Sequence, residues 1–269
     1  MNNKNINTSS EELNRKTRNI FLILGSFFIA NAILAEFIGI KMISLDKLFG
    51  QTNTQFSFLG LPINGLNIGV GVVLWPFVFI ISDIINEYFG KSGVKKISFI
   101  TAGLIAYAFV IVLIAIYLPP ADFWLEINSL DQNGNPVNIN NAYAMIFGQG
   151  LGIIVGSIFA FLVGQWIDAY VFQWFKSITQ HKYLWLRATG STVVSQLIDS
   201  ILVLFIAFYI FGKWSLGQVF AVGMMQYFLK IFLAIIFTPL IYLIHYLIDK
   251  YLGLDVAKAK QNEQENYTN

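Results

Sequence analysis

The chain has 269 residues, of which 56% are hydrophobic and 12% are charged, and its formal net charge is +2. A soluble domain carries about 25% charged residues. The 25 Phe and 6 Trp of this chain could hardly be solvated on the surface of a soluble protein. The composition excludes a soluble domain and indicates an all-α integral membrane protein. The chain has no Cys and only two His, which argues against disulfides and metal sites. We therefore expect neither a metal nor a cofactor.

Six apolar segments reach the length of about 20 residues that a membrane-spanning helix needs. They lie at roughly residues 19–43, 66–89, 97–118, 146–172, 188–211 and 218–248. The first of them is too long for a signal peptide. We therefore expect three parts, a polar tail at 1–18, a six-helix transmembrane domain at 19–252, and a polar, disordered tail at 253–269.

The basic residues are distributed unevenly between the connections. The N-terminal tail, the 90–96 and 173–187 loops and the C-terminal tail together carry thirteen Lys and Arg, whereas the alternate connections carry only Lys47 and Lys213. Basic connections stay on the cytoplasmic side of a membrane. Both termini and the two basic loops are therefore expected in the cytoplasm.

The connection at residues 119–145 should have structure of its own. It begins PPADFWLEI, which predicts a short interfacial helix anchored by Trp124. It continues DQNGNP, which is typical of a turn. Both a lid over a binding site and a plain connector fit this pattern.

Small residues and prolines predict how the helices pack. In the fourth span a small residue recurs at every fourth position, which favours the close approach of another helix. The stripe consists of Gly148, Gly152, Gly156, Ala160 and Gly164. The partner helix can belong to the same chain or to a second copy, so a homodimer fits as well. Pro76 and Pro239 predict kinks in the second and sixth spans.

Polar side chains interrupt the apolar spans at similar depths. In the second span three of them are spaced i, i+3 and i+4 and share one helix face, and the fourth and fifth spans each contain a Q-x-x-D motif. The residues are Asn31 in the first span, Asp83, Asn86 and Glu87 in the second, Gln165 and Asp168 in the fourth, and Gln196 and Asp199 in the fifth. An ionisable group inside a membrane costs about 2.5–3.5 kcal/mol, so such groups rarely occur without a role. We expect one shared site.

Some of these residues also have a structural interpretation. Glu87 precedes Lys91 by four residues, in the order that favours a surface ion pair. Glu36 and Lys41 can pair with each other near the outer end of the first span. Asn31 can serve as a hydrogen-bonding contact between helices.

The charge of the cluster indicates what it binds. The spans contain five acids, Glu36, Asp83, Glu87, Asp168 and Asp199, against two bases, Lys41 and Lys230. This excess of acid favours a cation, a proton or a solute rich in N–H donors. Phe79 and Phe172 lie one helical turn from Asp83 and Asp168, and each offers a stacking face. A planar, nucleobase-like ligand fits these groups.

Several stretches resemble one known family. ANAILAEFIGIK, WPFVFIISDIINEYFGK, GQWIDAYVF and LRATGSTVVSQLIDS are similar, in this order, to the queuosine precursor transporters, also called vitamin uptake transporters. The resemblance covers about residues 25–245. It implies six membrane helices, import of the 7-deazaguanine bases used to make queuosine in tRNA, and kinship with the substrate-binding subunits of energy-coupling-factor importers.

The resemblance also implies which residues form the site. The expected substrate-binding residues are Asn31, Asp83, Asn86, Glu87, Gln165, Asp168, Gln196 and Asp199. Phe79 is added to them because of its position one helical turn before Asp83, and not because of the resemblance. Lys41, Arg187 and Ser195 are expected to support them. The partners implied are the lipid bilayer and a small deazaguanine, and not a nucleic acid.

Two functional hypotheses of transport and one of catalysis remain. The first is import of 7-cyano- or 7-aminomethyl-7-deazaguanine across the inner membrane. The second is a substrate-binding membrane subunit of a vitamin importer with separate ATPase subunits, because the chain contains no P-loop pattern of its own. The third, an intramembrane enzyme that uses paired aspartates, is disfavoured because the acids come with Gln partners suited to binding. The choice of base and the energy source stay open.

Overall fold

The computed structural model describes residues 2–51, 55–58, 60–65, 67–148, 151–180 and 183–253. The predicted C-terminal tail, except Gly253, lies outside the described residues. Long helices dominate the described part of the chain. They are α1 (Asn2–Ile38), α3 (Trp75–Tyr117), α6 (Leu151–Ile178), α7 (Leu184–Leu204) and α8 (Leu216–Leu252), with a π-helical segment η2 (Phe205–Ile210) continuing α7.

Within the described residues, five helical segments are long and apolar enough to cross a membrane. They are Glu11–Ile38, Val70–Tyr117, Ile153–Ile178, Leu184–Ile210 and Leu216–Leu252. The structure is therefore mostly helical, which is consistent with the predicted class of all-α membrane protein. The number of segments differs from the expected six because the second and third predicted spans both fall within α3.

Helix α3 is interrupted at Gly90. This residue has φ 66° and ψ −173°, a backbone conformation that is not helical and that only glycine adopts readily. It divides the 43 residues of α3 into a first half, residues 75–89, and a second half, residues 91–117. The division falls at the predicted boundary between the second and third spans.

Contacts show that the two halves of α3 run in opposite directions. The first half of α3 contacts α6 through Ser82–Gln165 and Asn86–Ala169. Helix α1 contacts α6 through Phe28–Phe161 and Glu36–Ser157. Helix α1 contacts the second half of α3 through Gly25–Ile97 and Phe37–Phe109. The first half is thus parallel to α6, α6 is antiparallel to α1, and α1 is parallel to the second half. The chain therefore reverses at Gly90 without a loop.

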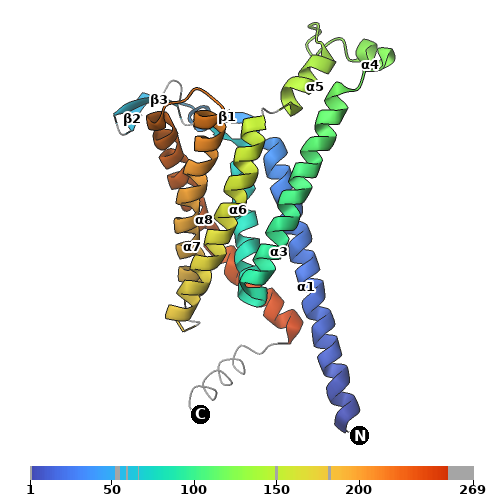
Figure 1. Cartoon of the computed structure of the whole chain (residues 1–269), viewed down its shortest axis with the longest axis vertical. Helices are drawn as coiled ribbons and strands as arrows, with labels where there is room; N and C mark the ends of the chain where they lie inside the picture. The colour runs from blue at the N-terminus through green and yellow to red at the C-terminus, as the bar shows by residue number, and fades with distance from the viewer. Residues whose placement is uncertain are drawn as a thin grey trace.

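The start of α1 and the end of α8 lie at the same end of the molecule, the lower end in Figure 1. Helix α1 begins at Asn2, so the described part of the predicted polar tail at 1–18 continues the first helix. The prediction that both termini share one side of the membrane is consistent with this arrangement.

The connections at the opposite end contain short elements. Strand β1 (Met42–Ser44) pairs antiparallel with β4 (Asn67–Gly69), and β2 (Gln55–Phe58) pairs antiparallel with β3 (Leu61–Asn64). The short helix α2 (Leu45–Leu48) follows β1, and the 3-10 helix η1 (Val70–Val73) follows β4. None of these elements was predicted from the sequence. They lie at the upper end of the molecule in Figure 1.

The 119–145 connection forms two short helices. The predicted interfacial helix is present as α4 (Asp122–Ile127), whereas α5 (Ile139–Phe147) was not predicted. Between them lies the predicted turn, in which backbone N–H groups of Asn135 and Asn133 donate to the carboxylate of Asp131. These bonds hold the pKa of Asp131 below its usual value, and the bond from the Asn135 backbone N–H has the largest effect.

The small-residue stripe packs inside the same chain. A Cβ on Gly156 would lie 3.2 Å from the backbone nitrogen of Ala207, and one on Gly164 would lie 3.4 Å from the Cβ of Asp199. The stripe thus meets η2 and α7. Gly148, by contrast, ends α5 as its C-terminal cap and does not belong to α6.

The two prolines behave differently. Pro239 lies inside α8, where the sequence predicts a kink. Pro76 was predicted to kink a helix, and this is wrong, because Pro76 occupies the first turn of α3. An N–H is not needed at that position, so proline begins the helix there without breaking it.

We predict that Gly156→Leu lowers the stability of the folded protein. The added side chain would meet Ile206 and the backbone of Ala207, and overpacking of this kind costs about 1–3 kcal/mol. Gly103→Leu is the matched control, because Gly103 lies on α3 with no atom within 4 Å of an added Cβ. Thermal unfolding midpoints in detergent would compare the two variants. Equal midpoints would contradict the close contact between α6 and η2.

Candidate functional site

Four buried polar residues from three helices form the centre of the candidate site. Asp83 comes from α3, Asp168 from α6, and Ser195 and Gln196 from α7, and none is more than 2% exposed. The Ser195 hydroxyl donates to Asp168 Oδ1 over 2.9 Å. Asp83 lies beside Asp168 and Ser191. The structure therefore brings together Asp83 of the predicted i, i+3, i+4 set, Asp168 of the first Q-x-x-D motif and Gln196 of the second.

Several atoms of this centre lack hydrogen-bond partners. Asp83 Oδ1, Asp168 Oδ2 and both amide atoms of Gln196 are buried with no partner among the described residues. A buried polar atom left unsatisfied costs about 1–3 kcal/mol, so four such atoms at one point require an explanation. Water, a proton or a bound ligand could satisfy them. No group of three or more acids or His in the described chain is placed to hold a metal ion.

A small cavity opens next to this centre, between the first half of α3, α7 and α8. Its lining includes Asp83 and Gln196, together with the aromatic rings of Trp75 and Phe79, whose centroids lie 6.1 Å apart. The cavity offers about 20 Å³, which is room for about one water molecule. No residue of the 119–145 connection lines it. In this conformation the centre is closed.

Lys230 brings a positive charge to the cavity. It lies on α8, lines the cavity, and its Nζ is 2.7 Å from Asp199 Oδ2 on α7. Asp199 was predicted to face the ligand, but its carboxylate is engaged by this ion pair. Sequence reasoning counted Lys230 as one of two intramembrane bases without assigning it to the site. Its position in the middle of the last span was the available signal.

Gln165 was predicted to bind the ligand and is buried beside the centre. Its Oε1 accepts a 2.7 Å hydrogen bond from Ser82, while its Nε2 has no partner among the described residues. However, Gln165 does not line the cavity of Asp83. It lines a separate groove between α6 and the second half of α3.

Asn86 shares a helix face with Asp83, yet its side chain joins helices. It donates to the carbonyl oxygen of Ala169 over 3.1 Å, and Gln173 Nε2 donates to Asn86 Oδ1 over 2.7 Å. The same Gln173 nitrogen lies 2.9 Å from the Asn86 backbone oxygen. These bonds occupy the amide, so Asn86 ties α3 to α6.

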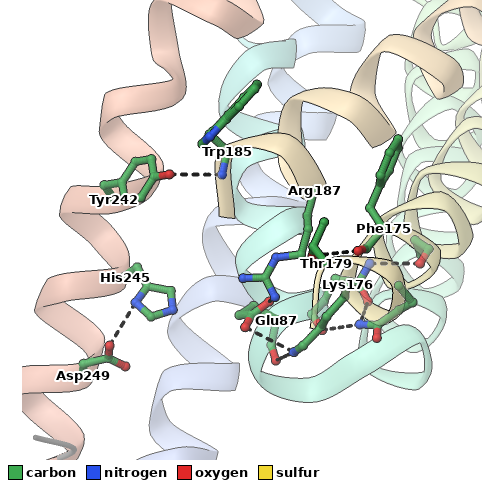
Figure 2. A network of polar contacts seen from close by, with 12 residues as sticks. Glu87, Phe175, Lys176, Thr179, Trp185, Arg187, Tyr242, His245 and Asp249 are labelled. Carbon is green, nitrogen blue, oxygen red and sulfur yellow. Dashed lines mark hydrogen bonds and ion pairs between the residues drawn. The ribbon is translucent and has the colours of Figure 1, made fainter. Parts of the chain in front are cut away.

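Glu87 holds two cations at the lower end of the bundle. Its carboxylate is 3.2 Å from Lys176 Nζ and 3.3 Å from Arg187 Nη1, and Figure 2 shows both cations converging on it. Lys91, which the sequence suggested as its partner, instead lies 3.6 Å from the ring centroid of Tyr170. Glu87 and Arg187 therefore connect α3, α6 and α7.

The next residue along α3 forms a second cluster with α8, which the sequence did not reveal. The Tyr88 hydroxyl donates to Asp249 Oδ1 over 2.6 Å, and His245 Nδ1 is 2.9 Å from Asp249 Oδ2. Nearby, the Trp185 backbone N–H donates to the Tyr242 hydroxyl (Figure 2). Adjacent residues of α3 thus fasten α6 and α7 on one side and α8 on the other.

Two predicted residues lie away from the centre. The Asn31 amide donates to the carbonyl oxygen of Phe27 in its own helix and lines an apolar groove between α1, α3 and α8. Lys41 is exposed in the turn after α1. Glu36 is buried and accepts a hydrogen bond from Ser157 of α6.

Known proteins with similar sequences support a role in transport. A family profile described as "Putative vitamin uptake transporter" matches residues 69–244, more than half of the chain. A Bacillus subtilis (strain 168) protein named "Probable queuosine precursor transporter" is 29% identical over 146 residues, which cover 54% of this chain and 58% of the relative. The match thus spans little more than half of that relative. No solved structure matches the chain.

We predict that Glu87→Gln strongly destabilises the protein. The change leaves Arg187, whose side chain is 4% exposed, without its carboxylate, and breaking a buried ion pair costs about 3–5 kcal/mol. Glu12→Gln is the control, because the Glu12–Lys16 pair lies on the surface with 54% of the Glu12 side chain exposed and is worth at most about 0.5 kcal/mol. Thermal unfolding in detergent measures both. A loss no larger than that of the control would contradict the structural role of Glu87.

Proposed function

Because the chain belongs to the vitamin uptake transporter family, we propose that it is a membrane transporter, rather than an enzyme, that imports queuosine precursors. The substrates would be 7-cyano-7-deazaguanine or 7-aminomethyl-7-deazaguanine, taken up across the inner membrane to make or salvage queuosine in tRNA. The chain is a multi-pass membrane protein, as its long apolar helices and its family indicate. The name of the Bacillus subtilis relative supports the choice of substrate.

The observation that carries this proposal is the set of unpaired polar atoms at the closed cavity. Asp83 Oδ1 is an acceptor, and Gln196 offers one acceptor and one amide donor, all buried and unsatisfied among the described residues. The edge of a guanine-like base presents adjacent N–H donors beside a carbonyl acceptor. A carboxylate paired with an amide matches that edge.

Other residues of the cavity suit the rest of a base. Trp75 and Phe79 offer aromatic faces on which a planar ring can stack. The Lys230 ammonium can donate to a ligand acceptor while Asp199 holds it in place. Asp168, fixed by Ser195, lies behind Asp83 and would orient it. Asn86 and Glu87 keep structural roles in this arrangement.

A base is several times larger than the water-sized cavity, so import requires the lining helices to separate. The first half of α3, α7 and α8 each form one wall of the cavity, so at least one of these helices would have to move relative to the others. We propose six membrane spans, with the two halves of α3 as the second and third and both termini in the cytoplasm. The thirteen basic residues on the same side as the termini support this orientation.

The description of the family favours a second candidate function. A vitamin uptake protein of this size could be the substrate-binding subunit of an importer whose ATPase subunits are separate chains, since the sequence has no P-loop. Uptake of labelled 7-cyano-7-deazaguanine into lipid vesicles that contain only this protein distinguishes the two. Uptake would support a self-sufficient transporter. Binding without uptake would favour the second candidate.

The membrane topology gives a direct test. We predict that a reporter inserted after Asn133, in the exposed turn between α4 and α5, reports an outside location, since exposed turns tolerate insertion. A reporter at the C-terminus should report the cytoplasm. Alkaline phosphatase and fluorescent-protein fusions measure the two sides. Both reporters on one side would refute the six-span arrangement.

We predict that Asp83→Asn impairs import of the base. The new amide replaces one acceptor oxygen with a donor that would face a ligand N–H, and loss of a charged hydrogen bond costs about 1.5–3 kcal/mol, or roughly 10- to 150-fold in affinity. The assay is concentration-dependent uptake of labelled 7-cyano-7-deazaguanine by cells that cannot synthesise it. The substitution also removes a like-charge contact with Asp168, so the amount of protein in the membrane should not fall.

Asp122→Asn is the matched control for this experiment. Asp122 is an exposed acid in the first turn of α4, far along the chain from the cavity, and its loss should leave uptake unchanged. Normal uptake by Asp83→Asn at normal abundance would show that Asp83 does not bind the base.

A further inference from the structure

A groove runs between α6 and the second half of α3, on the other side of α6 from the contacts with α7. Its volume is about 240 Å³. The walls are apolar and aromatic, and they include Val94, Phe99, Leu162 and Trp166. The Phe99 and Trp166 side chains are more than half exposed. The groove is therefore open to the surroundings of the bundle, which for a multi-pass membrane protein are lipid.

One end of this groove is positively charged. Lys91 and Lys95 line it where the second half of α3 begins, and none of its lining residues is acidic. Among the described residues, neither lysine has an ion-pair partner, although the Lys91 ammonium lies 3.6 Å from the Tyr170 ring centroid. Two lysines without a carboxylate partner, next to an apolar wall, suit a ligand that has both an anionic group and an apolar part.

Two buried donors at the groove are also unsatisfied. Ser98 is 4% exposed and Gln165 is 1% exposed, and both line the groove. The Ser98 hydroxyl and the Gln165 Nε2 have no hydrogen-bond partner among the described residues. In a membrane such donors need an acceptor more than they do in water.

We propose that this groove binds one anionic phospholipid. Its phosphate lies between Lys91 and Lys95, its ester oxygens accept from Ser98 and Gln165, and an acyl chain covers Leu162 and Trp166. Basic pockets between membrane helices suit anionic lipid headgroups. A free phosphate would leave the apolar wall bare, and a zwitterionic lipid would bring a cation of its own close to the two lysines. This site goes beyond the proposed transport and does not depend on which substrate is carried.

The experiment uses Trp166 as a reporter in the full-length protein. The protein is reconstituted in phosphatidylcholine vesicles that contain a minor fraction of lipid with brominated acyl chains, which quench nearby tryptophan fluorescence. Brominated phosphatidylglycerol should quench more than brominated phosphatidylcholine. The excess should vanish in Trp166→Phe and persist in Trp174→Phe, because Trp174 is an exposed residue of α6 that does not line the groove.

The charge requirement is tested with three neighbouring lysines. Each lysine near an anionic lipid contributes about 1 kcal/mol, or about five-fold in affinity, so Lys91→Gln and Lys95→Gln should each raise the half-saturating fraction of phosphatidylglycerol about five-fold. Lys96→Gln is the control, because Lys96 is exposed but does not line the groove. Lys95→Arg keeps the charge and should bind normally, which separates loss of charge from loss of folding.

Three results would overturn the proposal. Equal quenching by the two brominated lipids would mean that the groove accepts any lipid. An equal effect of Lys95→Gln and Lys96→Gln would indicate diffuse attraction to the membrane surface. No quenching of Trp166 by either lipid would indicate that protein, such as a second copy of the chain, covers the groove. Uptake of the base plays no part in these readouts, so failure here leaves the proposed transport untouched.

Discussion

Two buried carboxylates that form no ion pair among the described residues constrain the whole bundle. Asp83 and Asp168 are at most 2% exposed, so folding removes most of their contact with bulk water, and other contacts must offset this loss of hydration. Helix α6 lies between α3 and α7, where Asp168 accepts a hydrogen bond from Ser195 of α7 and Gln165 accepts one from Ser82 of α3. Gly164, opposite Asp199, lets α7 come close enough to α6 for the bond between Ser195 and Asp168.

Polar residues on one face of α3 differ in their surroundings: one lines the cavity, and the others contact neighbouring helices. Asp83 reaches the cavity with an oxygen that has neither a hydrogen bond nor an ion pair among the described residues. One turn later, Asn86 is hydrogen-bonded to α6, and Glu87 is ion-paired with Lys176 of α6 and Arg187 of α7. Tyr88 then extends the support to α8. A polar residue in a membrane helix is therefore informative about function when its atoms lack protein partners, and less so when they have them.

Much of this follows from the sequence, and the remainder depends on which helices are neighbours. Span positions and the meeting of Asp83, Asp168 and Gln196 could be predicted, because length, hydropathy and helical spacing are local properties. The partners of Glu87 could not, because Lys176 and Arg187 are distant in sequence and Lys91 is nearer. Pro76 was misplaced because hydropathy extends past the true start of α3. The role of Lys230 could not be predicted either, because it depends on the contact with Asp199 of the neighbouring helix.

The reversal of α3 at Gly90 also has a mechanical consequence. A single residue joins two long helices, so the joint has almost no slack, and a tilt of one helix must displace the other. The first of these helices carries Asp83, and the second carries Lys91 and Lys95. The proposed solute cavity and the proposed lipid groove would therefore be coupled mechanically through Gly90, and a change in the bound lipid would then alter how readily the cavity opens.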